Sequence, residues 1–188
     1  RGQWDERVSG EVEWRTVLDD DGLRDGLRSA YDAGIRAVAI CFLHGYRSPA
    51  HEEAAGNIAR DLGFTQVSVS HRASPLIKFV ARGDTTVVDA YLSPLLRRYV
   101  GHIASAIGED DPATRLFFMQ SSGGLTDAAL FQGKDAILSG PAGGVVGAAM
   151  TAAQAGMTKV IGFDMGGTST DVSHYHGEYE RSFETEIA

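Results

Sequence analysis

Cysteine is almost absent from this chain, which has only Cys41 among its 188 residues. A disulfide bond within the chain is therefore excluded, and the composition fits a reducing compartment such as the cytoplasm. The sequence also has no apolar run approaching the roughly 18 residues that a membrane-spanning helix needs, and no signal-peptide pattern. We therefore expect a cytoplasmic protein without a membrane partner.

Positive charge is scarce as well. The chain has 17 Lys and Arg residues against 25 Asp and Glu residues, which gives a formal net charge of −8. This balance argues against a general affinity for nucleic acid or for anionic membranes. A local anion site would have to use backbone N–H groups, because no basic surface is available. The 43% hydrophobic and 22% charged residues are otherwise typical of a globular protein with a real core.

The N-terminal part of the chain alternates between strand and helix patterns. Strand-like runs occupy 10–18, 36–44 and 66–70, and helical spacing of apolar residues occupies 19–34 and 48–63. The run 36–44 is almost continuously apolar, which is typical of a strand buried on both faces. We expect Ser48 to cap the second helix, with Pro49 at its first position. This order predicts an α/β fold with a largely parallel sheet covered by helices.

The segment 72–108 is mostly helical in pattern. Apolar residues at helical spacing keep one face of this helix apolar, and they are Val88, Leu92, Leu95, Tyr99, Ile103 and Ile107. Pro94 inside this pattern predicts a kink or a junction between two helices.

The C-terminal part has shorter elements. We expect a loop at 109–114, a buried strand at 115–120, a glycine-rich connection with one short helix at 121–144 and a helix of small residues at 145–156. Two strands at 159–164 and 170–176 follow, joined by MGGTS, and 178–184 begins a third strand.

The stretch DMGGTSTD at 164–171 carries the clearest chemistry. An apolar strand delivers Asp164 to its carboxyl end, where ligands usually bind in open α/β sheets. Gly166 and Gly167 can take positive φ values, so the N–H groups of Gly166, Gly167 and Thr168 would point into one concavity that fits phosphate oxygens. A plain hairpin with solvated hydroxyls is the simpler alternative. The full pattern D-x-G-G-T-x-T-D on two strands favours phosphate binding.

Other polar side chains would complete this site. The hydroxyl groups of Thr168, Ser169 and Thr170 would add hydrogen-bond donors. Asp164 would repel a phosphate directly, so we expect it to hold Mg²⁺, often through water. Asp171 would do the same or orient a water molecule.

Two other glycine clusters leave alternatives open. SGPAGGVVG (139–147) lacks the lysine and the spacing of a P-loop. It could begin a helix whose N–H groups near Gly143 and Gly144 point at an anion, or it could allow close packing of helix and sheet, and these interpretations are compatible. SSGGL (121–125) could line a site or form a simple turn.

Histidine and cysteine give weaker indications. His174 and His176 are two apart on an expected strand and could chelate a metal, although no third ligand has suitable spacing and exposed strand histidines are commoner. His44 ends an apolar run and could be a core, loop or site residue. Cys41 lies inside that run, which favours a buried structural thiol over a nucleophile.

Several motifs together resemble the hydantoinase A/5-oxoprolinase family, a branch of the actin-like ATPase superfamily. They are MQSSGGLT (119–126), LSGPAGGVVGA (138–148) and GFDMGGTSTDVS (162–173), with upstream similarity in AVAICFLHGYRSPAHE (37–52) and TTVVDAYLSPLLRRY (85–99). The resemblance covers the chain from about residue 20 onward. RGDTT (82–86) departs from the family pattern at Gly83 or Asp84, which leaves the role of that polar cluster open.

The resemblance implies an RNase H-like (actin-like ATPase) fold in partial form. Residues 1–70 would be the C-terminal part of the family's N-terminal region, and residues 71–188 the beginning of its hydantoinase A region. Family members are several times longer and carry two phosphate hairpins. The chain is therefore expected to be a fragment that contains the second hairpin and has no turnover alone.

The resemblance also implies a function. ATP and Mg²⁺ would be the cofactors, and a small cyclic amide such as hydantoin, N-methylhydantoin or 5-oxoproline would be opened. ATP would phosphorylate the amide oxygen before water attacks the activated carbon, and a hydantoinase B-like second subunit is an expected partner. No residue stands out as the catalytic base. The alternatives are a subunit of an ATP-dependent ketone carboxylase of the same family and a non-catalytic nucleotide-binding module.

Overall fold

The computed structural model describes residues 4–6, 12–14, 18–108 and 114–180. The chain forms two compact units. The first comprises residues 1–99 and 132–134, and the second comprises residues 100–131 and 135–188.

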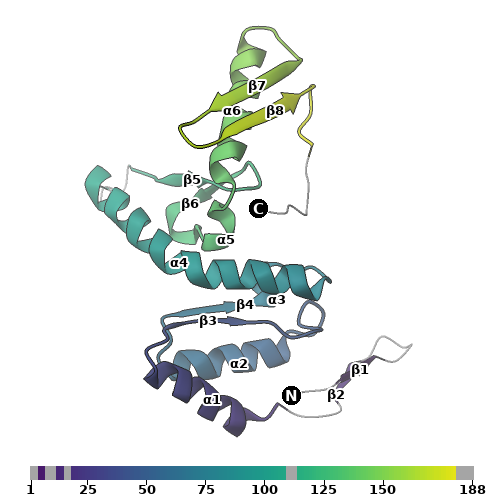
Figure 1. Cartoon of the computed structure of the whole chain (residues 1–188), viewed down its shortest axis with the longest axis vertical. Coiled ribbons are helices and arrows are strands. Elements are labelled where there is room, and N and C mark those ends of the chain that lie inside the picture. Colours follow the sequence, from purple (N-terminus) through teal and green to yellow (C-terminus); the bar gives the residue numbers. More distant parts are fainter. Residues whose placement is uncertain (1–3, 7–11, 15–17, 109–113, 181–188) are drawn as a thin grey trace. The chain divides into compact units, whose positions relative to one another are not determined.

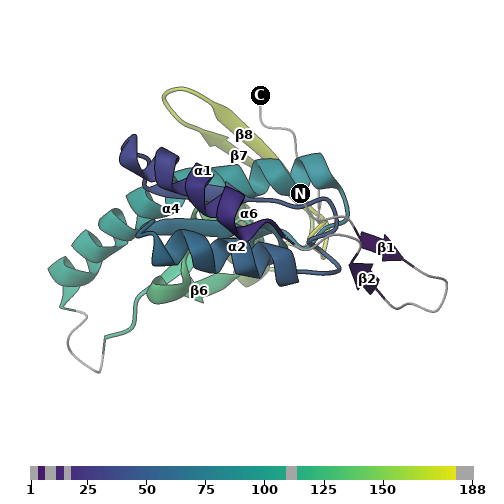
Figure 2. The ribbon, with the colours of Figure 1, turned by 90° about the horizontal axis from the view of Figure 1, so that it is seen from below.

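The first unit is built on a parallel pair of strands, β3 (Ala37–Ile40) and β4 (Gln66–Val69), which confirms the predicted parallel pairing. Helices α1 (Asp20–Asp32) and α2 (Ala50–Asp61) lie together on one face of this pair (Figures 1 and 2). On the other face lies the first part of α4 (Phe79–Ile107), which follows the short helix α3 (Ser70–Ala73).

An antiparallel pair precedes these elements. Strands β1 (Trp4–Glu6) and β2 (Val12–Trp14) pair with Trp4 opposite Trp14. The strand predicted at 10–18 is confirmed at 12–14, and residues 10, 11 and 15–17 lie outside the described residues.

The two N-terminal helices begin differently. The Asp19 side chain caps α1 by accepting the N–H of Gly22 at 3.0 Å, and acids fill the first turn as predicted. Helix α2 begins at Ala50, and its N-cap is Pro49, which has no side-chain hydrogen bond to offer. The predicted Ser48 cap is therefore wrong. The Ser48 N–H instead donates to the carbonyl of His44 at 3.0 Å, which places Ser48 in the preceding turn.

Apolar packing in the first unit is concentrated between the strands and α2. Buried residues there are Ile40, Ala55, Ile58, Ala59, Leu62, Phe64 and Val69. Leu23 and Leu27 of α1 pack against this core from outside. Strand β3 is shorter than the predicted run 36–44, and only Ile40 in it is fully buried. The expected burial on both faces is therefore wrong for the rest of this strand.

The other face of β4 is polar, and this changes the interpretation of α4. In QVSVS, Val67 and Val69 face the apolar core, whereas Gln66, Ser68 and Ser70 are buried on the α4 side. The buried stripe of α4 is correspondingly Arg82, Thr86, Asp89, Ser93 and Val100, with Ala90 beside it. The apolar face is not the buried one, since Leu95, Tyr99 and Ile107 are 46%, 60% and 48% exposed.

Helix α4 is one continuous element that contains Pro94. The predicted junction between two helices is therefore not observed. Asp89, one turn before the proline, is the centre of a buried hydrogen-bond network. Its carboxylate accepts from Ser68 Oγ at 2.6 Å, from Ser93 Oγ at 3.1 Å and from the N–H of Lys134 at 3.2 Å. Ser93 Oγ in turn accepts the N–H of Gly133 at 2.9 Å.

Residue 133 must be glycine for this contact to form. A Cβ there would lie 2.9 Å from the backbone nitrogen of Ser93 and 3.0 Å from the carbonyl of Asp89, and neither backbone atom can move away easily. We expect Gly133→Ala to lower the free energy of unfolding by about 1–3 kcal/mol, measured by urea titration. The control Gly26→Ala, in α1 with open space around it, should stabilise by up to about 1 kcal/mol. Equal effects of the two changes would contradict the close approach.

A second buried polar cluster centres on Glu52 of α2, whose side chain is 0% exposed. Burial alone would raise the pKa of Glu52, but hydrogen bonds from Ser70, the Phe42 N–H and His71 hold that pKa below its ordinary value of 4.5. A lowered pKa means that the ionised carboxylate stabilises the fold above its unfolded-state pKa. This stabilisation is lost as the pH falls through the folded-state pKa.

We therefore expect acid to destabilise the first unit through Glu52. The free energy of unfolding should fall as the pH drops from about 6 to about 3, and Glu52→Gln should flatten this dependence. Urea titrations of both proteins across this pH range provide the measurement. The interpretation fails if the variant keeps the full acid dependence, since other carboxyl groups would then be responsible.

The second unit contains two hairpins and one long helix. Strands β5 (Phe117–Met119) and β6 (Leu125–Asp127) pair antiparallel and are followed by a 3₁₀ turn at Ala128–Leu130. Helix α5 (Gly133–Ala136) begins with residues of the first unit and ends in the second, and α6 (Ser139–Gln154) follows it. Strands β7 (Val160–Met165) and β8 (Thr170–Tyr175) form the second hairpin, which lies beside α6 (Figure 1). The predicted buried strand at 115–120 is wrong in burial, because Phe117 is 41% exposed.

Three smaller outcomes concern the chain between and after these elements. The glycine-rich connection contains β6 and α5 as well as the predicted turn. No strand begins at residues 178–180, and the rest of the third strand predicted at 178–184 lies outside the described residues. The loop predicted at 109–114 also falls almost entirely outside them. None of the described helices is both long and apolar enough to cross a membrane.

Candidate functional site

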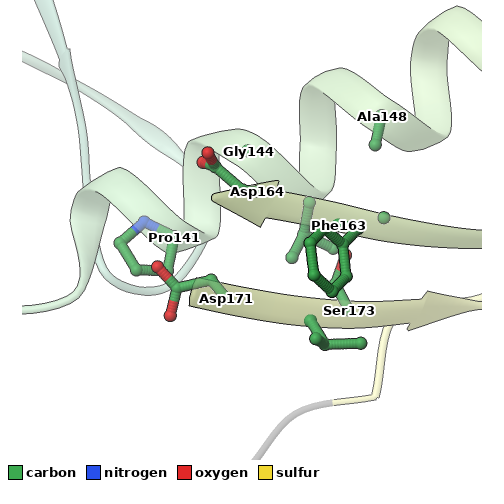
Figure 3. A pocket seen from close by; sticks show the side chains of 10 residues that line it. Pro141, Gly144, Ala148, Phe163, Asp164, Asp171 and Ser173 are labelled. Atoms are coloured by element: carbon green, nitrogen blue, oxygen red, sulfur yellow. The ribbon is translucent and has the colours of Figure 1, made fainter. Parts of the chain in front are cut away.

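The predicted phosphate hairpin forms as two paired strands. In its register Asp164 lies directly opposite Asp171, and Met165 lies opposite Thr170. Asp164 comes near the end of β7 and Asp171 near the start of β8, so both carboxylates are at the turn end of the hairpin (Figure 3). The sequence places these two acids seven residues apart, and the tight turn between the strands brings them together.

The turn itself differs from the expected geometry. Neither Gly166 nor Gly167 has a positive φ, so that part of the prediction is wrong. The Gly166 N–H donates to the carbonyl of Ser169 at 2.9 Å, which closes the turn and removes this N–H from the expected nest. The N–H groups of Gly167 and Thr168 have no partner within the described part of the chain. These two groups are the ones available to an anion.

Helix α6 begins earlier than predicted and covers one face of the hairpin. Its hydrogen bonds have started by Ala142, whose N–H donates to Leu138 at 3.0 Å. The N–H groups of Gly143 and Gly144 therefore lie within the helix and not at its first residue. These glycines have no side chain, and this lets α6 lie close to neighbouring residues. A Cβ at Gly144 would lie 3.8 Å from Asp164 Oδ2, and one at Gly143 would lie 3.5 Å from Met119 Cγ.

A hollow of about 340 Å³ lies between α6 and the hairpin, inside the second unit (Figure 3). Its walls are Pro141, Gly144, Val145 and Ala148 of α6 and Gly162, Phe163, Asp164, Asp171, Val172 and Ser173 of the hairpin. One end is acidic, and the other is lined by Phe163, Ala148 and Ser173 (Figure 3). Ser173 is the polar residue that the sequence analysis missed. Its position two residues after Asp171 on a strand puts it on the same face, and this spacing was the available signal.

The donor set fits a hydrated cation better than a caged one. Two carboxylates are available, and no wall residue of the hollow is Lys, Arg or His. Among the described residues no group of three or more His, Cys, Asp or Glu side chains could hold a metal. Mg²⁺ usually keeps several waters and binds through one or two carboxylates plus substrate phosphates, which matches this arrangement. The assignments of Asp164 and Asp171 to the metal, and of residues 166–170, Gly143 and Gly144 to the nucleotide, stay predictions.

The other candidate residues do not join this site. His174 and His176 are exposed, with ring centroids 6.2 Å apart, and among the described residues no third His, Cys, Asp or Glu joins them to form a metal site. Cys41 is partly buried in the first unit, where its sulfur lies 3.9 Å from the carbonyl of Phe79. SSGGL (121–125) forms the turn between β5 and β6, with Gly123 at a φ of +82°.

Comparison with known proteins identifies the family. The model of the family described as Hydantoinase/oxoprolinase matches residues 82–188 of this chain. The model of that family's N-terminal region matches residues 2–63. The chain is 47% identical to 5-oxoprolinase of Saccharomyces cerevisiae over 172 residues, covering 90% of this chain and 13% of that protein. It is 45% identical to 5-oxoprolinase 1 of Arabidopsis thaliana over 184 residues, which cover 96% of this chain and 14% of that protein.

Two solved structures share the fold. ATP-dependent caprolactamase from Pseudomonas jessenii superimposes with a TM-score of 0.78 at 31% identity, covering 92% of this chain and 25% of that one. Nucleotide-free acetone carboxylase superimposes with a TM-score of 0.76 at 26% identity, and the match covers 94% of this chain and 25% of that one. The fold is thus the expected α/β RNase H-like (actin-like ATPase) fold in partial form. The chain belongs to the hydantoinase/oxoprolinase family, and it spans about one seventh of the length of these curated 5-oxoprolinases.

Proposed function

We propose that this chain supplies one phosphate-binding hairpin to a longer ATP-dependent enzyme that opens a small cyclic amide. The observation that carries the proposal is the pairing of Asp164 with Asp171 beside a turn with two available N–H groups. The 47% identity to a 5-oxoprolinase supports the class of substrate.

Each part of the hairpin has its own task in this proposal. The N–H groups of Gly167 and Thr168 bind phosphate oxygens, and the hydroxyls of Thr168, Ser169 and Thr170 add donors. Asp164 and Asp171 hold Mg²⁺ through its waters. When bound, the cation neutralises charge on the transferred phosphoryl group. Gly144 lets α6 approach Asp164 closely, and this keeps the carboxylate at the wall of the hollow.

Phosphorylation is a sensible route to opening such a ring. An amide carbonyl is stabilised by resonance and has a poor leaving group, so transfer of phosphate to its oxygen makes the carbon open to attack by water. The protein's contribution to such a step is positioning and electrostatic stabilisation. We assign no residue as the base for the attacking water. We also propose a hydantoinase B-like second subunit and a cytoplasmic location, which fit the name caprolactamase subunit alpha of one relative and the single cysteine.

A second candidate function is a subunit of an ATP-dependent ketone carboxylase, which is favoured by the structural likeness to acetone carboxylase. The two differ in their products. We expect the full-length protein to release ADP in proportion to ring opening when it is given 5-oxoproline, hydantoins or lactams. Bicarbonate-dependent loss of a ketone would favour the second function. Absence of turnover on all of these substrates would leave the non-catalytic nucleotide-binding module.

A further inference from the structure

Two fully buried charged side chains lie at the carboxyl ends of β3 and β4, in the unit that does not contain the phosphate hairpin. Glu52 of α2 and Arg82 of α4 are both 0% exposed. Burying such charges costs several kcal/mol unless every donor and acceptor is satisfied, and apolar side chains of similar size are often at least as stabilising. Their presence therefore calls for a role beyond filling the core.

Glu52 uses all of its acceptor capacity within the protein. One carboxylate oxygen accepts the Phe42 N–H at 2.7 Å and the Ser70 hydroxyl, and the other accepts the His71 N–H at 2.9 Å and faces His71 Nδ1 at 2.8 Å. Because the pKa of Glu52 is lowered, the carboxylate is ionised and His71 Nδ1 is the donor. Gly45 lies against the same carboxylate, which leaves no room for a side chain there.

Arg82 likewise uses its whole guanidinium group. The acceptors are Ser70 Oγ at 2.9 Å, Leu76 O at 2.6 Å, Ile77 O at 3.3 Å, Phe42 O at 2.6 Å and Leu43 O at 3.0 Å. Ser70 thus accepts from Arg82 and donates to Glu52, so the two charges are connected through one hydroxyl. With five hydrogen bonds made, Arg82 has no donor left for a ligand. Its other four partners are backbone carbonyls of two segments, 42–43 and 76–77.

We propose that Glu52 and Arg82 are positioning residues that fix segments 42–45 and 76–77 in one conformation, and that these segments contact the cyclic amide rather than the nucleotide. Ligands in α/β sheets bind outside the carboxyl ends of the strands, where both segments lie. The exposed side chains of these segments are mainly apolar, with Leu43 59% and Ile77 68% exposed, and the partly buried His44 lies next to Leu43. Such a surface fits the methylene groups of a small lactam ring, and neither segment carries a Lys or Arg side chain that would bind phosphate. The second half of this inference rests on the proposed function.

Conservative variants test the positioning role. Arg82→Lys keeps the charge but has three donors on one nitrogen, which cannot reach carbonyls on two separate segments. Glu52→Gln replaces one acceptor oxygen with a donor group. In the full-length protein we expect amide hydrogen exchange in 42–45 and 76–77 to become about tenfold faster or more in either variant, with α1 and α2 unchanged. The control Arg97→Lys alters an arginine of the same helix that donates to Gln66 at 2.6 Å, and it should leave these segments protected.

A kinetic measurement tests the ligand. For Arg82→Lys we expect the KM for the cyclic amide to rise about tenfold while the Kd for Mg·ATP stays unchanged. Unchanged exchange in both segments would overturn the positioning role. Faster exchange spread evenly over the first unit, or unfolding of both variants, would overturn it as well. Equal losses of amide and nucleotide affinity would overturn the ligand assignment. If the unaltered protein opens no ring, the proposed function and the ligand assignment fail together, whereas the exchange result still decides the positioning role.

Discussion

In the full-length protein, Asp164→Asn is expected to lower ATP-dependent turnover by at least about 100-fold. The change keeps the size of the side chain and removes the negative charge beside α6, where a Cβ at Gly144 would lie 3.8 Å from Asp164 Oδ2. Asp171 alone then faces the cation. Because Asp164 is exposed and has no hydrogen-bond partner within the described residues, the fold should be unaffected. Steady-state kinetics and isothermal titration with Mg·ATP measure the effect.

Two companion variants separate metal binding from phosphate binding and from general damage. A Cβ at Gly167 has nothing within 4 Å, and its φ is not positive, so Gly167→Val should fold normally. Its side chain would stand beside the available N–H groups and weaken nucleotide binding. Glu178→Gln, an exposed acid outside the walls of the hollow, is the control and should behave like the unaltered protein. Full activity in both Asp164→Asn and Gly167→Val would refute the site.

The largest effect on stability is expected from Asp89→Ala. The change leaves the hydroxyls of Ser68 and Ser93 and the N–H of Lys134 without their buried acceptor. We expect the free energy of unfolding to fall by about 2–4 kcal/mol, because each buried polar group that loses its partner costs about 1–3 kcal/mol. Urea titration measures this difference.

The same helix offers a matched control. Asp84 is exposed and lies five positions before Asp89 along α4, so Asp84→Ala removes an equal charge without touching the network. We expect it to change the free energy of unfolding by less than about 0.5 kcal/mol. Similar losses in the two variants would show that helix charge, and not the buried acceptor, is what matters.

Local patterns predicted the elements that depend on neighbouring residues. The strand–helix–strand order of the first unit and the β7–β8 hairpin follow from apolar periodicity and from Gly-Gly between two strand-like runs. The hairpin register then brings Asp164 and Asp171 together without any long-range information. The start of α6 also had a local signal that was missed. Pro141 lies in the first turn of the helix, where its missing N–H has no cost.

Features that depend on distant partners could not be predicted in this way. Helix α4 has an apolar stripe at good helical spacing, but its buried stripe is Arg82, Thr86, Asp89 and Ser93. These residues are buried because the facing side of β4 carries Gln66, Ser68 and Ser70, and hydrogen bonding across the interface replaces apolar contact. The spacing of the polar residues becomes informative only when the facing strand is known.

The residues 132–134 have a consequence for how the chain can be divided. The chain passes between the two units three times, after residues 99, 131 and 134, and Asp89 and Ser93 hold the short middle passage. A cut at residue 100 would therefore separate Gly133 and Lys134 from their acceptors and leave both pieces incomplete. Proteolysis or expression in halves would not isolate two independent folding modules. The order of the units along the sequence is thus interleaved, and their unfolding should be cooperative.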